Sequence, residues 1–309
     1  MTIVVPILCV VVTISESLLG IGCNGFICLV NCINLIKSKK MSLSEFLITS
    51  LTISRIFFLC IIVADVFMIF YFDSEITRGM QIFSLLWIFA NFLSIWLATC
   101  LSILYCLKIA NFSHRVFLWL KWRVFYVVKG ILLVSVLFSF FSTLAMLKGF
   151  DSTFRSAQMT CTANCTKDIR EQQSILFYTY ISMALCMVIP FIVSLISYIL
   201  VILSLRRHTQ QMQNNGIGSR DPSTEAHVRA TKITLSFVFL FIMYLVAFFI
   251  IILGFFLPDI KLAWMTGELI LAAHPSVHSI ILIFVNNKLK QAFLGVFQIK
   301  KWGMKGGAK

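Results

Sequence analysis

Two histidines in the last long apolar stretch have the spacing of metal ligands. His274 and His278 are four residues apart, so a continuous helix would place both imidazole rings on one face. Pro275 lies between them and disturbs that helix, and no further Cys or acidic residue is placed to supply a third ligand. We therefore predict no metal site. We interpret His274-Pro275 as a kink and His278 as part of the structural core.

Five polar or aromatic side chains fall at a similar depth in separate apolar stretches. Glu268 lies six residues into its stretch, which is about 9 Å along a helix. Trp87 and Asn91 lie one helical turn apart on one face of another stretch. Asp65 and Tyr244 belong to two more. Any one of these aromatic residues could serve packing alone, but a few polar groups converging among aromatic walls predict a small-molecule site.

The common enzyme motifs are missing from the sequence. It contains no Gly-rich phosphate loop, no His-Glu-x-x-His, no Gly-x-Ser-x-Gly and no Cys-x-x-Cys. Neither paired acids nor a nucleophile with its base is visible at one depth. We therefore expect a protein that is not an enzyme and that binds no cofactor.

The composition indicates a membrane protein. Of the 309 residues 60% are apolar and 12% are charged, with a mean hydropathy of +0.96. Ordinary soluble domains are about 45–50% apolar and about 25% charged. The net charge of +14 would suggest a nucleic-acid partner in a soluble protein. In so apolar a chain the charge points to a membrane instead, and we expect no nucleic-acid partner.

Seven stretches are long and apolar enough to cross a bilayer, which takes roughly 20 residues as a helix. The predicted spans are residues 3–36, 46–72, 82–107, 124–147, 175–205, 233–257 and 262–284. Only Glu16 interrupts the first of them. This pattern predicts an all-α membrane protein, a seven-transmembrane helix bundle formed by one domain over residues 1–309. Residues 286–309 mix apolar and basic side chains, which predicts a tail with a short amphipathic helix on the inner leaflet.

The distribution of basic residues predicts the orientation. Most of the 26 Lys and Arg residues lie in the loops after spans one, three and five and in the tail. Cytoplasmic loops carry this excess, so we predict the N-terminus outside and the C-terminus inside, in a multi-pass protein of the plasma membrane. The longest outer loop, residues 148–173, then contains a glycosylation sequon at Asn164.

Asn24 and Arg55 are polar residues inside the first two spans. Arg55 lies about nine residues, roughly 13 Å, from the inner end of its span, and Asn24 reaches a similar depth. Ionisable groups at membrane depth are costly, so each is first considered as a functional residue. No carboxylate is placed to neutralise Arg55. We favour a structural role for this pair, tying spans one and two together, over contact with a ligand.

Motifs in span three, the inner loops and span seven carry a resemblance to one known family. The motifs are WLATCLS at 96–102, LKIANFSH at 107–114, LWLKWR at 118–123, RRHT at 206–209, RDPSTEAHVRA at 220–230 and HPSVHS at 274–279. In these motifs the chain resembles the type 2 (bitter) taste receptors, a branch of the G-protein-coupled receptors. The likeness extends over nearly the whole chain.

The resemblance implies an activity and roles for particular residues. A small bitter agonist would enter from outside and stabilise a form that engages a gustducin-like or Gi-type G protein. Trp87, Asn91 and Glu268 match family positions that line the agonist pocket, and Asn164 matches the glycosylation position. The cytoplasmic coupling region would comprise Tyr105, Lys108, Arg206, Arg207 and His208. Its basic rim would meet acidic groups on the G protein and anionic membrane lipids.

A vomeronasal-type pheromone receptor and a transporter or channel are the two alternatives to a bitter taste receptor. A vomeronasal-type pheromone receptor is a related seven-span protein of similar length, which the motifs at 220–230 and 107–114 disfavour. A transporter or channel would use Arg55, Asp65 and Glu268 to line a path. The sequence shows neither an inverted repeat nor a trail of polar residues across the full thickness, which disfavours that class.

Overall fold

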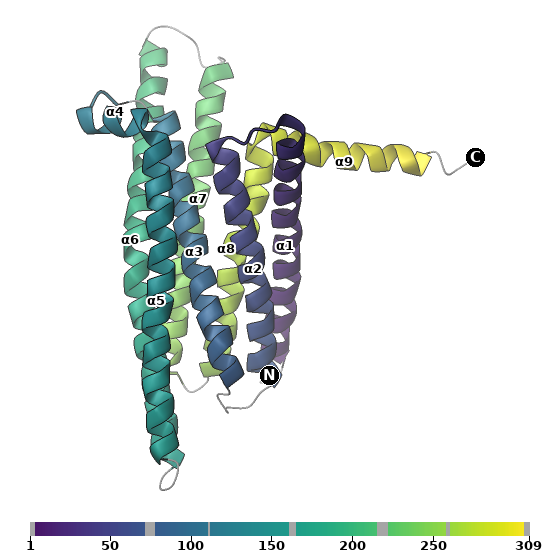
Figure 1. The fold of residues 1–309 in the computed structure, drawn as a ribbon. Helices are drawn as coiled ribbons and strands as arrows, with labels where there is room; N and C mark the ends of the chain where they lie inside the picture. The colour runs from purple at the N-terminus through teal and green to yellow at the C-terminus, as the bar shows by residue number, and fades with distance from the viewer. Residues whose placement is uncertain are drawn as a thin grey trace.

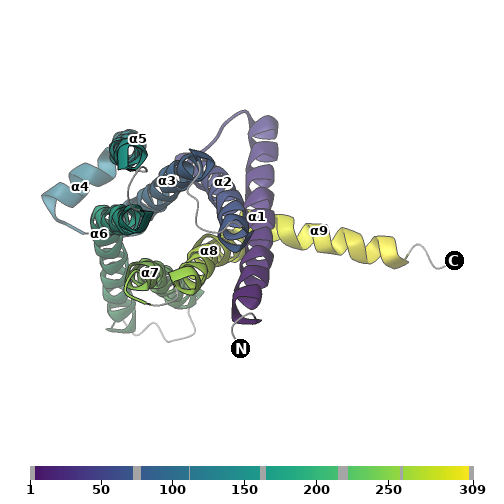
Figure 2. The same cartoon turned by 90° about the horizontal axis from the view of Figure 1, so that it is seen from below.

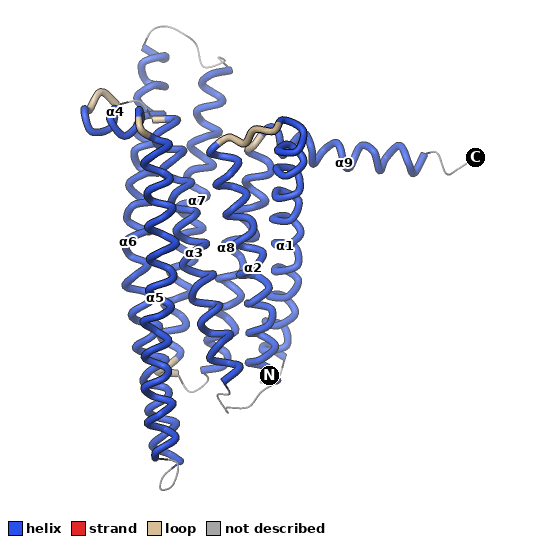
Figure 3. Tube along the Cα trace, viewed as in Figure 1, coloured by secondary structure: helices blue, strands red, loops and turns tan. Residues whose placement is uncertain are grey.

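Helices make up all the regular structure in the part of the chain that the computed structural model describes, which is residues 4–71, 78–110, 112–160, 165–214, 222–257 and 260–305. Figure 3 shows these helices in blue. The helices are α1 (Val4–Ser38), α2 (Leu43–Tyr71), α3 (Arg78–Ile109), α4 (Arg115–Trp122), α5 (Val124–Thr160), α6 (Cys165–Asn214), α7 (Pro222–Gly254), α8 (Ile260–Val285) and α9 (Asn287–Lys305). No strand occurs within these ranges.

Seven of the helices are long and apolar enough to cross a membrane. Their apolar segments are Val4–Ser38, Leu43–Met68, Phe83–Ile109, Val124–Leu144, Ile181–Arg207, Thr234–Gly254 and Lys261–Val285. The predicted seven-helix membrane bundle is therefore confirmed. In Figure 1 the first residues of α1 and the last helix, α9, lie at opposite ends of the bundle, as an odd number of spans requires.

The region predicted as the longest loop, residues 148–173, is mostly helical. Helix α5 continues to Thr160 and α6 begins at Cys165, and both helices extend past their neighbours at the lower end of Figure 1. The segment lies between two apolar spans, as expected, and its helical structure was not predicted because hydropathy marks the end of the apolar segment and not the end of the helix. A polar helix can continue into water with its backbone hydrogen bonds intact.

Helix α3 is the central helix of the bundle. Of the residues in its most apolar segment, 72% are buried, against 17% in α1 and in α5. It packs against α2, α5 and α6, whereas α8 packs against α1, α2 and α7. The view along the bundle in Figure 2 shows α1 and α7 on either side of α8. Side chains of α2, α3, α7 and α8 therefore meet in the interior.

The N-terminal end of α2 is fixed by two sets of contacts. Ser42 Oγ accepts a hydrogen bond from the backbone N–H of Glu45 at 3.2 Å, and the Glu45 carboxylate accepts one from the N–H of Ser42 at 2.9 Å. This reciprocal pair is a capping box. The other carboxylate oxygen of Glu45 is 2.5 Å from Lys288 Nζ at the start of α9. Phe293 of α9 packs on Phe26 of α1, with ring centroids 5.6 Å apart. The start of the tail helix is thus attached to the end of the bundle, and α9 extends sideways from there, away from the other helices, in Figure 1.

A glycine allows α1 and α8 to approach closely. A Cβ atom on Gly20 would lie 2.2 Å from Ser276 Oγ and 2.8 Å from Leu59 Cδ1. At this contact Ser276 Oγ donates a hydrogen bond of 3.2 Å to the backbone carbonyl of Glu16. Small residues at helix contacts are typical of membrane bundles, where association depends on van der Waals packing and interhelical hydrogen bonds.

Gly20→Ala should destabilise the bundle, and Gly22→Ala should not. The added methyl group at Gly20 must displace the Ser276 and Leu59 side chains and disturb the hydrogen bond from Ser276, at a cost of roughly 1–3 kcal/mol in the free energy of unfolding. A Cβ on Gly22 meets nothing within 4 Å, so the same substitution there changes only helix propensity, in the favourable direction. The unfolding midpoints of the two purified variants in detergent, monitored by circular dichroism during heating, measure these effects. Equal midpoints for the two variants would contradict the close contact.

Candidate functional site

Four of the five residues predicted to line a ligand pocket are buried close to one another. Trp87 and Asn91 come from α3, Tyr244 from α7 and Glu268 from α8, and each side chain is no more than 4% exposed. The Tyr244 hydroxyl donates a hydrogen bond to Asn91 Oδ1, which joins α7 to α3 in the interior. Asp65 of α2 is half-buried. Three helices thus bring together residues that are far apart in the sequence.

Aromatic rings surround these polar groups. The Trp87 ring lies between those of Phe58 and Phe248, with centroid distances of 6.0 Å and 6.1 Å. Phe248 also packs on Tyr244 at 5.3 Å. Centroid separations of about 4.5–7 Å are those of favourable aromatic pairs. The rings hold the Trp87 and Tyr244 side chains in place and give the interior apolar walls.

Two polar atoms in this cluster retain unused hydrogen-bonding capacity among the described residues. Asn91 Nδ2 and Glu268 Oε2 are both buried and have no hydrogen-bond partner there. The Asp65 carboxyl, the Tyr244 hydroxyl and the Trp87 indole lie close enough to interact electrostatically with Glu268. A buried polar atom without a partner costs free energy, so each of these two atoms is a site where a ligand atom would be favourable. Asn91 Nδ2 is a hydrogen-bond donor, whereas Glu268 Oε2 belongs to a carboxyl group.

Arg55 lies in a second polar cluster, which residues of α1, α2 and α8 form. Its side chain is fully buried, and Nη1 is 3.0 Å from His278 Nδ1 and 3.4 Å from Ser279 Oγ. Ser279 Oγ also lies 2.7 Å from Asn24 Oδ1. Asn24 and Arg55, which we expected to tie α1 to α2, are thus connected through Ser279 of α8. The sequence analysis included Ser279 in the motif at 274–279 but assigned it no role, because serine is common in membrane helices.

His274 and His278 face the interior of the bundle at two levels. The two rings are 5.9 Å apart. His278 stacks on Phe237 at 4.2 Å, whereas His274 contacts the Tyr244 ring at 5.3 Å. Helix α8 continues through Pro275. Within the described ranges no three His, Cys, Asp or Glu side chains come close enough to hold a metal ion.

The residues predicted to couple to a G protein gather at the end of the bundle that carries α9. Tyr105 is half-buried near the end of α3, and Lys108, Arg206 and Arg207 are exposed. The Arg207 guanidinium lies over the Phe112 ring at 5.7 Å from its centroid. His208 belongs to α6, but its side chain is outside the described part of the structure. Asn164 also lies outside the described residues.

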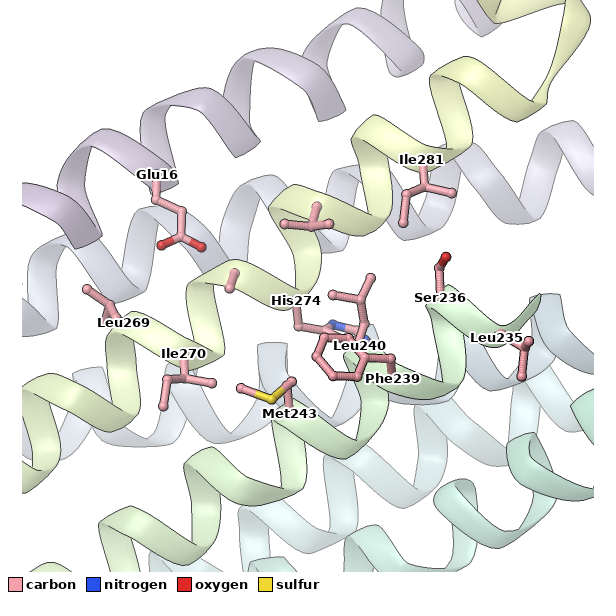
Figure 4. A pocket seen from close by; sticks show the side chains of 12 residues that line it. Glu16, Leu235, Ser236, Phe239, Leu240, Met243, Leu269, Ile270, His274 and Ile281 are labelled. Carbon is pink, nitrogen blue, oxygen red and sulfur yellow. The ribbon is translucent and has the colours of Figure 1, made fainter. Parts of the chain in front are cut away.

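A cavity of about 720 Å³ lies elsewhere, between α1, α7 and α8. Figure 4 shows Glu16 on α1 facing it, together with His274 on α8 and Met243 on α7. None of Trp87, Asn91, Tyr244 and Glu268 lines this cavity. The sequence assigned no role to Glu16. The available signal was that Glu16 is an acidic residue inside an otherwise apolar span.

Comparison with known proteins identifies the family. The family model described as Taste receptor protein (TAS2R) matches residues 1–301. Taste receptor type 2 member 3 of Homo sapiens is 48% identical over 299 residues, which are 96% of this chain and 94% of that protein. The Papio hamadryas protein of the same name is 46% identical over 297 residues, with the same coverage. Taste receptor type 2 member 7 of Papio hamadryas is 44% identical over 286 residues, covering 92% and 90% of the two chains.

These matches cover nearly the whole chain, and they favour a taste receptor over a vomeronasal-type receptor or a transporter. They also place the chain among receptors rather than enzymes. The same assignment agrees with the six motifs at residues 96–102, 107–114, 118–123, 206–209, 220–230 and 274–279. The chain belongs to the type 2 (bitter) taste receptors, a family of G-protein-coupled receptors with seven membrane-spanning helices.

Proposed function

We propose that this receptor binds small bitter compounds in the interior cluster of Trp87, Asn91, Tyr244 and Glu268, with Asp65 at its edge. The observation that carries the proposal is the pair of buried polar atoms, Asn91 Nδ2 and Glu268 Oε2, that lack a partner among the described residues. Such atoms, set among aromatic rings, are the groups that orient a ligand, while the rings supply most of its affinity.

The chemistry of the cluster favours a particular kind of agonist. The Tyr244 hydroxyl already uses Asn91 Oδ1, so Asn91 offers its N–H groups to an acceptor on the ligand. Glu268 offers an acceptor and, when ionised, a negative charge. An aromatic or polycyclic compound with a carbonyl or ether oxygen near one end and a basic amine near the other would satisfy both groups.

Activation follows from a shift in population between two arrangements of the helices. An agonist favours the active arrangement only as far as it binds that arrangement more tightly than the resting one. The Tyr244–Asn91 hydrogen bond connects α7 to α3, so a ligand that contacts Asn91 acts on that connection. The end of the bundle that carries α9 faces the cytoplasm in this proposal. There the basic side chains Lys108, Arg206 and Arg207, with His208 and Tyr105, engage a gustducin-like or Gi-type G protein and anionic lipid.

The direct test is calcium release in cells that express the chain with a promiscuous taste-type G protein, during exposure to a panel of structurally diverse bitter compounds. We expect at least one compound to give a response that depends on both the receptor and the G protein. A receptor that reaches the cell surface but responds to no compound in a broad panel would argue against the proposed ligand class.

Glu268→Gln should weaken responses to amine-bearing agonists by about tenfold or more, because the neutral amide removes the charge partner of the amine. Neutral agonists should be affected less. Thr266→Val is a matched control two residues away on α8, since Thr266 Oγ1 bonds to the backbone carbonyl of Leu262 within the same helix. Dose-response curves at equal surface expression measure the effect. Equal curves for Glu268→Gln and Thr266→Val across amine and neutral agonists would remove Glu268 from the pocket.

Tyr244→Phe should lower stability, because it leaves Asn91 Oδ1 buried without its donor. The loss should be about 1–3 kcal/mol in the free energy of unfolding. Tyr178→Phe is the control, since Tyr178 is exposed on α6 and its hydroxyl can bond to solvent. The apparent unfolding midpoint of the purified protein is the measurement. A midpoint for Tyr244→Phe that matches Tyr178→Phe would show that the interhelical bond contributes nothing.

Asn164→Gln should remove one N-linked glycan and reduce delivery to the cell surface. Only a sequon on the outer side of the membrane is modified, so the same variant tests the orientation with the N-terminus outside. Gel mobility before and after glycosidase treatment provides the measurement. If wild type and variant migrate identically before treatment, the sequon is unmodified and the predicted orientation loses this support.

A further inference from the structure

The cavity between α1, α7 and α8 is a groove on the outside of the bundle. It has a volume of about 720 Å³. Its α7 wall includes Leu235 and Phe239, which are 52% and 61% exposed, and its floor includes Val277 of α8, which is 38% exposed. These apolar side chains lie within membrane-spanning segments, so the groove opens to lipid and not to water.

Glu16 is the acidic residue of this groove. It lies 12 residues after the start of α1, about 18 Å along the helix and therefore deep in the hydrocarbon layer. In Figure 4 its carboxylate faces the groove from α1. Its backbone carbonyl accepts a hydrogen bond from Ser276, but no described residue forms a hydrogen bond or ion pair with the carboxylate. A carboxyl group in this position is costly unless it meets a partner.

We propose that the groove binds an amphiphile dissolved in the membrane that carries a protonated amine, with the amine paired to Glu16. Charge complementarity selects the amine, because an ion pair is far stronger in a low-dielectric environment than in water. The apolar walls select a hydrophobic body. Pockets for drug-sized ligands have volumes of about 300–1,000 Å³, and this groove lies within that range. A sterol or a phospholipid tail could cover the same walls but would leave the carboxylate without a cation.

The groove is separate from the proposed agonist site but touches it through one side chain. His274 lines the groove, and its ring packs on Tyr244, which donates the hydrogen bond to Asn91. An occupant of the groove would therefore contact His274, whose ring also packs on Tyr244 of the interior cluster. The inference depends on the membrane fold alone, so it can fail or hold independently of the agonist proposal.

Photolabelling of the full chain in phosphatidylcholine nanodiscs tests the inference. The probe is a dodecyl-dimethylamine that carries a diazirine in its alkyl chain, and the neutral comparison is the same diazirine on dodecanol. Labelled peptides are identified by mass spectrometry. We expect the amine to label the groove walls on α7 and α8 and unlabelled dodecyl-dimethylamine to compete. Dodecanol should label these peptides about tenfold less, since it lacks the charge.

Three variants distinguish the effect of the Glu16 charge from the effect of the volume of the groove. Glu16→Gln keeps the shape of the side chain and should lower labelling by the amine about tenfold. Ala273→Phe keeps the acid and fills the groove from α8, and should also lower labelling. Ser15→Ala is the control on α1, because Ser15 is exposed, bonds to the carbonyl of Val11 and does not line the groove. Its labelling should equal that of wild type.

The unfolding midpoint of each variant shows whether it folds. If Ala273→Phe does not fold, the labelling of Glu16→Gln alone decides the result. Equal labelling by dodecanol and the amine, or unchanged labelling in Glu16→Gln, would show a groove that accepts any lipid chain and would overturn the proposal. Labelling confined to other helices would overturn it as well.

Discussion

The hydrocarbon layer offers the backbone no hydrogen-bond partners, so each segment that crosses it must satisfy its own N–H and C=O groups. The structure meets this requirement with seven helices long enough to span the membrane. Once the backbone groups are hydrogen-bonded within each helix, the positions of the polar side chains decide how the helices pack against one another. A polar side chain on the outer face meets lipid, so most of those in the spans lie inside or between helices. The buried polar residues of this chain are therefore found where helices meet, and they determine which helices are joined.

Two interior clusters illustrate how polar groups join the bundle at different depths. In one, Tyr244 of α7 bonds to Asn91 of α3. In the other, Ser279 of α8 lies between Arg55 of α2 and Asn24 of α1. Neither cluster satisfies all its polar atoms within the described part of the chain: Asn91 Nδ2 and two nitrogens of Arg55 have no hydrogen-bond partner there. In the first cluster Trp87 and Tyr244 pack on the rings of Phe58 and Phe248, whereas in the second the Phe237 ring stacks on His278. We assign the ligand to the first cluster because it has more aromatic surface, and a structural role to the second.

The sequence predicted the spans because length and hydropathy directly report what a bilayer requires. It also predicted that Asp65, Trp87, Asn91, Tyr244 and Glu268 share a depth, since a rise of about 1.5 Å per residue converts sequence position into height along a helix. Four of these five are buried close to one another, and Asp65 is half-buried. Rotation about each helix axis is harder to infer. Glu16 and Glu268 are both single acids in apolar spans, yet Glu268 is 2% exposed in the interior whereas Glu16 faces a groove on the outside. The polar extensions of α5 and α6 were missed because hydropathy carries no information about helices outside the membrane.

Helix α8 connects these features. Glu268, His274 and His278 lie along it at three heights, and they contact the ligand cluster, the lipid-facing groove and the Arg55 cluster respectively. The close approach at Gly20 holds the same helix against α1. A shift of α8 along or about its axis would change all three sets of contacts together, because they share one rigid backbone. Coupling between two sites requires an element with two arrangements that each ligand prefers differently. Helix α8 is the element on which both proposed ligands act, so a ligand in the groove can alter agonist affinity only by preferring one position of this helix.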